Sequence, residues 1–309
     1  MKALSREIAG LVTVWLLACP LVCSGNCSKQ AIFFNVVGND FIVRRNVRAD
    51  DFNVKVDGRP TQVVSLSLDY SPRRIVLMVD TSDSMHASER RSGWGIALRT
   101  ATFAFDSVPS SSSIALLTFG DGVHSQTDGF RDRSEVANKV LSLTKQEPEG
   151  PTAVLDSINQ ALSLFQRPQI GDSIFLVTDG VDNRSKISLN ILREELISRG
   201  VRVFLFLVPV EGYLTLDEER ARSLVESLTG YTGGYLIRIP WNEIGTDRQK
   251  TATAVTQIAS QVQSLYRMEL ELPSVANLKG SVKMTLRPQK QGDEFLTYPR
   301  KLAPCAAMP

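Results

Sequence analysis

The middle of the chain contains four short, almost continuous runs of apolar residues. They span residues 75–79, 114–119, 174–177 and 201–208. Runs of this length, in which polar residues do not alternate with apolar ones, predict β-strands that are buried on both faces. We therefore expect these four segments to form the centre of a sheet.

Segments with helical periodicity lie between and after these runs. The apolar residues of 152–166 fall on one helical face, and those of 188–199 do the same. Two further helices are expected, one after a capping box made by Thr215 and Glu218 and one from about Thr251 to Leu265. Strands and helices that alternate predict an α/β fold, with a doubly wound, mainly parallel sheet flanked by helices on both faces.

The two flanks of the chain have β-like segments, and most of these alternate apolar and polar residues, as is typical of strands with one buried face. The segments concerned are 33–37, 52–56 and 63–68 before the α/β region, and 266–272 and 282–286 after it. The pair Asp57-Gly58, between two alternating runs, predicts a β-hairpin. We expect the two flanks to pack together as one small β module.

These patterns predict four parts along the chain. Residues 1–25 form a signal peptide, and residues 26–71 form the N-terminal part of the β module. Residues 72–265 form the α/β domain. Residues 266–309 form a C-terminal strand extension that packs with the N-terminal module.

Composition and charge narrow the class of protein. The chain has 309 residues, which is enough for one enlarged domain or for two. Its mean hydropathy of −0.05 is too low for a polytopic membrane protein. The 35 basic and 33 acidic residues give a net charge of +2, which is too small to indicate nucleic acid or an anionic membrane surface as the partner. Function must therefore depend on a local site.

The N-terminus has the layout of a secretory signal peptide. Lys2 and Arg6 precede an apolar run that is too short to span a bilayer comfortably. Two kinds of processing are open: cleavage after Ser24, with Val22 at position −3, or lipidation of Cys19 in a segment that loosely resembles a bacterial lipobox. A buried helix of a cytosolic protein is the alternative. We predict an exported protein, periplasmic or extracellular, or a lipoprotein on the cell envelope.

The four cysteines do not form a disulfide framework. Cys19, Cys23 and Cys27 lie near the N-terminus, and Cys305 lies near the other end. After cleavage near Ser24, Cys27 and Cys305 would remain and could pair in an exported chain.

Side chains that end in oxygen gather at the carboxyl ends of the predicted strands. The candidates are Asp80, Ser82 and Ser84 after the first apolar run, Thr152 before the first helix, and Asp179 after the run at 174–177. In open α/β sheets, ligands bind beyond the carboxyl ends of the strands. Two carboxylates and three hydroxyls suit a hard divalent cation, with Mg²⁺ favoured and Mn²⁺ or Ca²⁺ possible.

This arrangement resembles the metal-ion-dependent adhesion site of von Willebrand factor type A domains, which have a Rossmann-like fold. The resemblance covers about residues 72–265, and the flanking strands resemble those of exported bacterial proteins called von Willebrand factor A-related, which are abundant in acidobacteria. Asp83 stands where the family often has glycine, and it adds a third carboxylate near the expected metal.

The resemblance implies a mechanism of binding. It implies that Ser82, Ser84 and Thr152 give hydroxyl oxygens to the ion, while Asp80 and Asp179 act largely through water. A carboxylate from a partner protein would then complete the coordination. A Thr152 that engages the metal in one state only would couple binding to loop movement.

Other interpretations of these residues are possible. Each candidate alone could be a turn residue or a helix cap, as we expect for Asp121 and Asp182. A hydrolase would need a base near Ser82 or Ser84, and the sequence has neither a nucleophile elbow nor a glycine-rich phosphate loop. A phosphohydrolase that uses Asp80 and Mg²⁺ is conceivable, as is a structural envelope protein with an idle site. We predict a metal-dependent, adhesion-type protein-binding module rather than an enzyme.

Overall fold

The computed structural model describes residues 28–86, 93–167, 169, 171–209, 213–239, 248–272, 278–287 and 294–303. The predicted signal peptide and all four cysteines lie outside these ranges. Within the ranges described, no helix is both long and apolar enough to cross a membrane.

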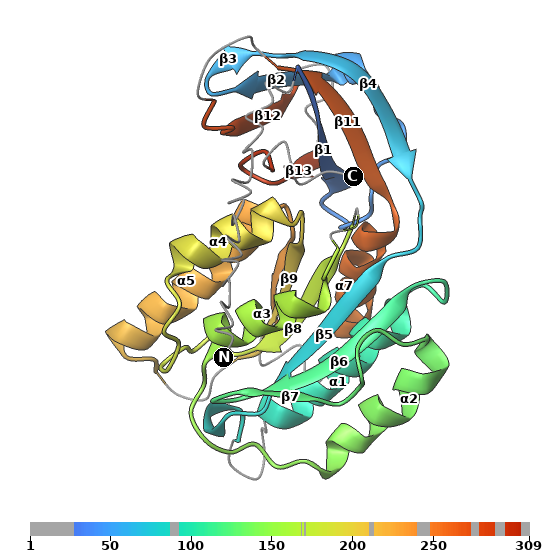
Figure 1. Ribbon diagram of the computed structural model, residues 1–309. Coiled ribbons are helices and arrows are strands. Elements are labelled where there is room, and N and C mark those ends of the chain that lie inside the picture. The colour runs from blue at the N-terminus through green and yellow to red at the C-terminus, as the bar shows by residue number, and fades with distance from the viewer. Residues whose placement is uncertain are drawn as a thin grey trace, which may run out of the picture.

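A six-stranded sheet forms the centre of the molecule (Figure 1). Its strands, in spatial order, are β10 (Leu236–Arg238), β9 (Arg202–Leu207), β8 (Ser173–Thr178), β5 (Arg74–Asp80), β6 (Ser113–Phe119) and β7 (Val123–Ser125). All neighbours are parallel except β7, which pairs antiparallel with β6. The four apolar runs are the four central strands, so the predicted mainly parallel sheet is confirmed.

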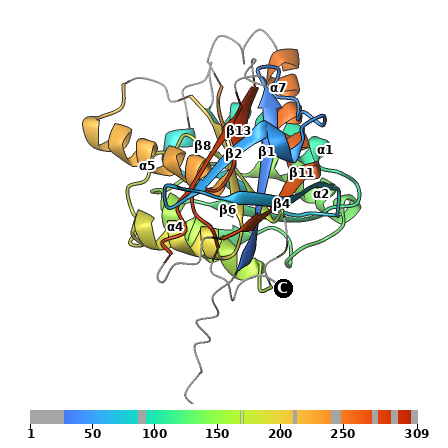
Figure 2. The ribbon, with the colours of Figure 1, turned by 90° about the horizontal axis from the view of Figure 1, so that it is seen from above.

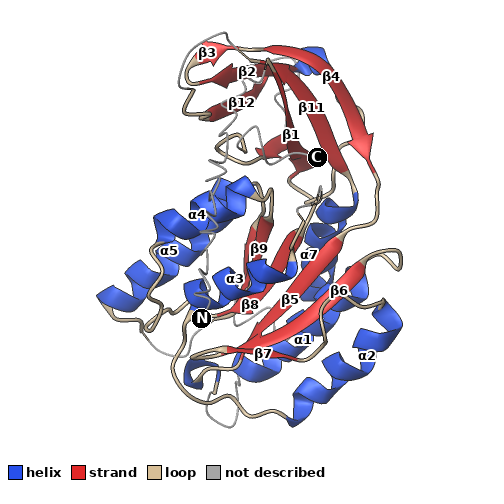
Figure 3. Cartoon of the chain, viewed as in Figure 1, coloured by secondary structure: helices blue, strands red, loops and turns tan. Residues whose placement is uncertain are grey.

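Helices cover both faces of this sheet (Figure 3). One face packs against α1 (Gly93–Ser107), α2 (Arg133–Ser142) and α7 (Arg248–Gln263), and the other against α3 (Val154–Ala161), α4 (Leu189–Ser198) and α5 (Leu216–Thr232). Short 3-10 turns occur at η1 (Ala49–Asp51), η2 (Asp83–Met85), η3 (Leu143–Lys145) and η4 (Leu162–Leu164). Alternate residues of β5 enter opposite cores, which is why residues 75–79 are all apolar.

The helix ends test the sequence patterns. Thr215 and Glu218 form the predicted capping box at the start of α5. The last helix was predicted to reach Leu265 and this was wrong, since α7 ends at Gln263 and Leu265 is the first residue of the next strand. Leu265 is fully buried and pairs with Asp69, so its apolar character serves the strand rather than a helical face.

The flanks of the chain supply two further sheets. One has the order β13 (Glu294–Thr297), β1 (Lys29–Gly38), β11 (Leu265–Glu271) and β4 (Gln62–Asp69), and the other has β12 (Val282–Leu286), β2 (Phe52–Val56) and β3 (Arg59–Pro60). Their inner faces share one apolar core. Strands from the two ends of the chain therefore lie side by side, at one end of the α/β domain in Figure 1 and in front of it when seen from above in Figure 2.

The predicted hairpin at Asp57-Gly58 is present, but its second strand is not the expected one. Both turn residues have positive φ (48° and 79°), as a tight two-residue turn requires, and β2 pairs across it with the two-residue strand β3. Pro60 has no amide hydrogen to continue the ladder, and the run at 63–68 instead joins β11 in the other sheet.

Candidate metal centre

Two buried carboxylates meet at the carboxyl edge of the central sheet. Asp80 is the last residue of β5, and Asp179 directly follows β8. These strands are parallel neighbours with Val79 opposite Val177, so their ends coincide. Asp80 is 0% exposed and Asp179 is 1% exposed. The fold therefore brings together two acidic residues that are 99 positions apart in the chain.

Hydrogen bonds fix Asp80 in place. Its Oδ1 accepts from the Ser82 backbone N–H at 3.0 Å and from the Ser82 hydroxyl at 2.6 Å, while its Oδ2 accepts from the Thr178 hydroxyl at 2.5 Å. The Ser82 and Ser84 hydroxyl oxygens are 3.1 Å apart, which joins Ser84 to the same network. Thr178 was not predicted as part of the site, although it immediately precedes Asp179 and ends the strand next to Asp80.

Asp179 is satisfied on one side only. Its Oδ1 accepts from the Val181 backbone N–H at 2.9 Å. Its Oδ2 is buried and has no hydrogen-bond partner within the part of the chain that the structure describes. A buried carboxylate oxygen without a donor costs free energy, unless a cation or a proton reaches it.

Asp80 and Asp179 repel each other when both carboxylates are charged. Burial, followed by repulsion from Asp179, raises the pKa of Asp80 to about 7. Burial also raises the pKa of Asp179, although the nearby Ser84 hydroxyl, the hydrogen bond from the Val181 backbone N–H and the positive charge of Arg222 act in the other direction. A divalent cation held by these groups would offset the cost of burying two carboxylates as well as their repulsion.

Thr152 lies in a loop that is tied to the loops after three strands. The backbone N–H of Asp83 donates to the Gly150 carbonyl, and the Gly150 N–H donates back to Asp83 Oδ1, both at 2.9 Å. The Thr152 N–H donates to Asn183 Oδ1 at 3.1 Å. The Ala153 N–H donates to the Gly120 carbonyl at 2.8 Å. Thr152 itself is 2% exposed.

Two acidic residues of the neighbouring loops bond to backbone amides. Asp83, expected as a third carboxylate near the metal, uses Oδ1 to hold the Thr152 loop. Asp182, expected to be a solvated residue or a cap, accepts from the backbone N–H of Leu155 in the first turn of α3 and from that of Ser185, each at 3.1 Å. The role of Asn183 was not predicted, because nothing in the sequence relates it to a loop 31 residues away.

The candidate ligands include few carboxylates and several hydroxyls. Within the described ranges, no group of three or more His, Cys, Asp or Glu side chains could hold a metal ion. The residues that converge here are two carboxylates and the hydroxyls around them, which are the hard oxygen donors preferred by Mg²⁺, Mn²⁺ and Ca²⁺. The unpartnered Asp179 Oδ2 beside Asp80 shows that the residues present fit a divalent cation.

Several solved structures are similar to part of this chain. Conserved hypothetical protein BatB from Bacteroides thetaiotaomicron is 19% identical, with 62% of this chain and 98% of that chain covered and a TM-score of 0.47. A von Willebrand factor type A protein from Catenulispora acidiphila is 14% identical, with 90% and 75% covered and a TM-score of 0.47. Proximal thread matrix protein 1 from the mussel byssus, solved with a zinc-occupied metal-ion-dependent adhesion site, is 18% identical, with 65% and 49% covered and a TM-score of 0.46.

The match to a family model includes the candidate metal centre. A search of curated proteins found no match. Residues 75–181 match the family model described as von Willebrand factor type A domain, and this range includes all five candidate ligands. Over residues 75–181, the chain is therefore similar to a von Willebrand factor type A domain.

Proposed function

We propose that the protein is an exported, divalent-metal-dependent binding module of the adhesion type, which captures an acidic group of a partner protein. The observation that carries the proposal is the buried Asp179 Oδ2, which has no donor among the described residues and lies in a site shared with Asp80. This pair of buried carboxylates needs a positive charge to compensate it, and the surrounding hydroxyl oxygens are suited to coordinate a divalent cation.

Each side chain has a distinct part in the proposed site. Ser82, Ser84 and Thr152 would supply neutral hydroxyl oxygens, and Asp80 and Asp179 would supply the negative charge that holds the ion. The bound cation supplies the positive charge that attracts a partner's carboxylate. Ser84 is exposed, whereas Asp80, Ser82 and Asp179 are buried, so the partner would approach from the side of Ser84.

The state of Asp80 supports a binding module over a phosphohydrolase. Asp80 is fully buried, and both of its carboxylate oxygens accept hydrogen bonds from Ser82 or Thr178. A carboxylate nucleophile has to reach the substrate phosphorus, and this side chain is held away from solvent.

Export follows from the sequence of the N-terminus. A basic start and a short apolar run over residues 1–25 support a signal peptide. Processing at Ser24 would release the protein to the periplasm or the exterior, and lipidation of Cys19 would keep it on the envelope. Mass measurement of the mature protein distinguishes these outcomes, because lipidation adds acyl chains to the new N-terminus.

Thermal unfolding tests the metal site. The Tm should rise by a few degrees when EDTA is replaced by Mg²⁺, Mn²⁺ or Ca²⁺, because an ion that binds the folded state stabilises it by mass action. Zn²⁺ completes the panel, since carboxylate oxygens also bind it. Asp80→Ala should abolish the rise, and Asp121→Ala, which removes an exposed carboxylate from a neighbouring loop, should leave it unchanged.

Partner capture tests the binding role. Partners retained in Mg²⁺ should be released by EDTA and should be absent with Asp80→Ala. Capture at full strength by Asp80→Ala would refute the proposed mechanism. A metal-induced Tm rise without metal-dependent capture would leave the ion as a structural element and would refute the adhesion role.

A further inference from the structure

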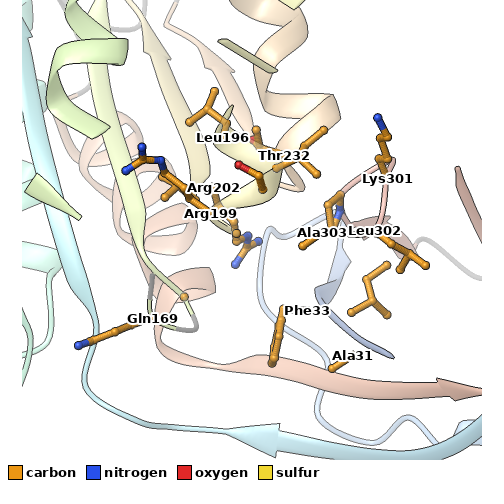
Figure 4. A pocket seen from close by; sticks show the side chains of 17 residues that line it. Ala31, Phe33, Gln169, Leu196, Arg199, Arg202, Thr232, Lys301, Leu302 and Ala303 are labelled. Carbon is orange, nitrogen blue, oxygen red and sulfur yellow. The ribbon is translucent and has the colours of Figure 1, made fainter. Parts of the chain in front are cut away.

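A cavity of about 80 Å³ lies at the edge of the central sheet opposite the candidate metal centre (Figure 4). Its walls come from β1, from the end of α4 with the start of β9, and from the chain segment 299–303. The cavity therefore lies between the α/β domain and the β module. Its volume is several times the roughly 10–15 Å³ that one water molecule needs.

The lining is mainly apolar. Side chains of both parts of the molecule contribute to it, and they include Ala31, Ile32, Phe33, Leu196, Ile197 and Leu302. An apolar cavity of this kind favours a hydrocarbon group over water, because water there would lack hydrogen-bond partners.

One buried cation interrupts this lining. Arg202, the first residue of β9, is only 3% exposed. Its Nε and Nη2 donate to the Gly233 carbonyl at 2.9 and 2.6 Å, and Nη2 also donates to Asn35 Oδ1 at 2.6 Å. Its Nη1 is buried and has no hydrogen-bond partner among the residues that the structure describes. The guanidinium is thus held firmly by two of its nitrogens, while the third is left unsatisfied.

Arg202 also differs from the other cations around the cavity in its ion pairing. Arg199 pairs with Glu195 at 3.3 Å, and Lys301 pairs with Glu194 at 2.6 Å. Within the described ranges, no carboxylate forms an ion pair with Arg202. Burial, together with the nearby positive charge of Arg73, lowers the pKa of Arg202 to about 9. A single negative charge beside the guanidinium would compensate this buried cation.

We propose that this cavity binds a small aliphatic monocarboxylate, with its carboxylate beside the guanidinium of Arg202 and its hydrocarbon chain against the apolar wall. A charge of one matches the one cation of the lining that has no carboxylate partner among the described residues, and charge-assisted hydrogen bonds from a guanidinium to a carboxylate are among the strongest in proteins. The ligand would touch both the α/β domain and the β module, and it would hold them together.

Thermal unfolding and calorimetry of the full chain in EDTA, with hexanoate as the probe, test the proposal. Hexanoate should raise the Tm by a few degrees in a saturable manner. Hexanol, which has the same carbon chain without charge, and hexylamine, which has the opposite charge, should bind at least about ten-fold more weakly. Inorganic phosphate tests whether an anion without a hydrocarbon chain suffices, and it should not raise the Tm.

Variants locate the binding. Arg202→Met should weaken hexanoate binding at least about ten-fold, and Ala303→Phe should also reduce it, because the ring would fill space in the cavity. The control is Arg220→Met, which removes an exposed arginine that already has an aspartate partner and does not line the cavity, and it should not change the affinity.

Three results would overturn the proposal. They are the absence of saturable binding of hexanoate, equal binding of hexanol or phosphate, and unchanged affinity in Arg202→Met. If Arg202→Met does not fold, the comparison of hexanoate with hexanol and hexylamine on the unaltered protein still decides the matter.

Discussion

The two edges of the central sheet differ in how far their buried charges are compensated. At the carboxyl edge, Asp80 and Asp179 lie together, and Asp179 Oδ2 has no donor within the described ranges. At the amino edge, Arg74 begins β5 and forms a two-pronged pair with Asp172, its Nε and Nη2 lying 2.9 and 2.5 Å from the two carboxylate oxygens.

Buried charges that the fold itself compensates have a structural role, and those that it leaves incompletely compensated are candidates for ligand binding. Asp172 is 0% exposed, but Arg74 and a backbone amide satisfy it. Arg202 at the same edge and the acidic pair at the opposite edge each leave one buried polar atom without a partner. A buried charge that the fold has already paired serves stability, whereas one that is incompletely satisfied indicates a binding site.

The largest effect on stability is expected at the amino edge, where Arg74 and Asp172 form an ion pair. Arg74→Met should lower the free energy of unfolding by about 3–5 kcal/mol, because it leaves the Asp172 carboxylate buried without its cation. Urea denaturation measures the change. Arg220→Met, which breaks an exposed pair with Asp217, is the control and should have little effect. A small loss in Arg74→Met would remove the distinction between the edges.

The next effect is a dependence of stability on pH at the acidic edge. The pKa of Asp80 is about 7 in the folded protein against an ordinary 3.8, so the folded state binds more protons between these values. Stability in EDTA should therefore fall as the pH rises from about 4 to 7, by up to about 4 kcal/mol. Asp80→Asn should remove this part of the slope, and metal ions should stabilise the protein most above pH 7. An identical slope in Asp80→Asn would contradict the assignment.

The smallest effect is expected for the residue that holds the Thr152 loop. Asp83→Ala removes the acceptor for the Gly150 N–H and should weaken metal binding by roughly 1 kcal/mol, or about five-fold, since Thr152 loses part of its anchorage. Asp83→Asn keeps an acceptor oxygen and should retain most of the affinity. Calorimetric titration with Mg²⁺ measures both. If Asp83→Asn is as weak as Asp83→Ala, the negative charge of Asp83 matters and the hydrogen bond does not.

The sequence was sufficient to predict the central strands and the loops that carry the candidate ligands. Apolar runs of strand length end at Asp80 and just before Asp179, and parallel pairing then brings these ends together. The sequence could not predict hydrogen-bond partners where a contact joins distant loops, as between Asp83 and Gly150. Arg202 gave no sign of its role, because it lies in an apolar run and its partner Asn35 is 167 positions away.

The pairing of β1 with β11 has a consequence for the order of folding. Lys29 lies opposite Glu271, and β13 completes the other side of β1. During synthesis the ribosome must therefore deliver more than two hundred further residues before β1 can pair, whereas residues 74–263 form the central sheet and its helices as one continuous stretch. The α/β domain can fold first, and the β module closes last, as its long-range contacts require. Until then β1 is an apolar strand with two open edges, and newly made chains are most prone to aggregate through it.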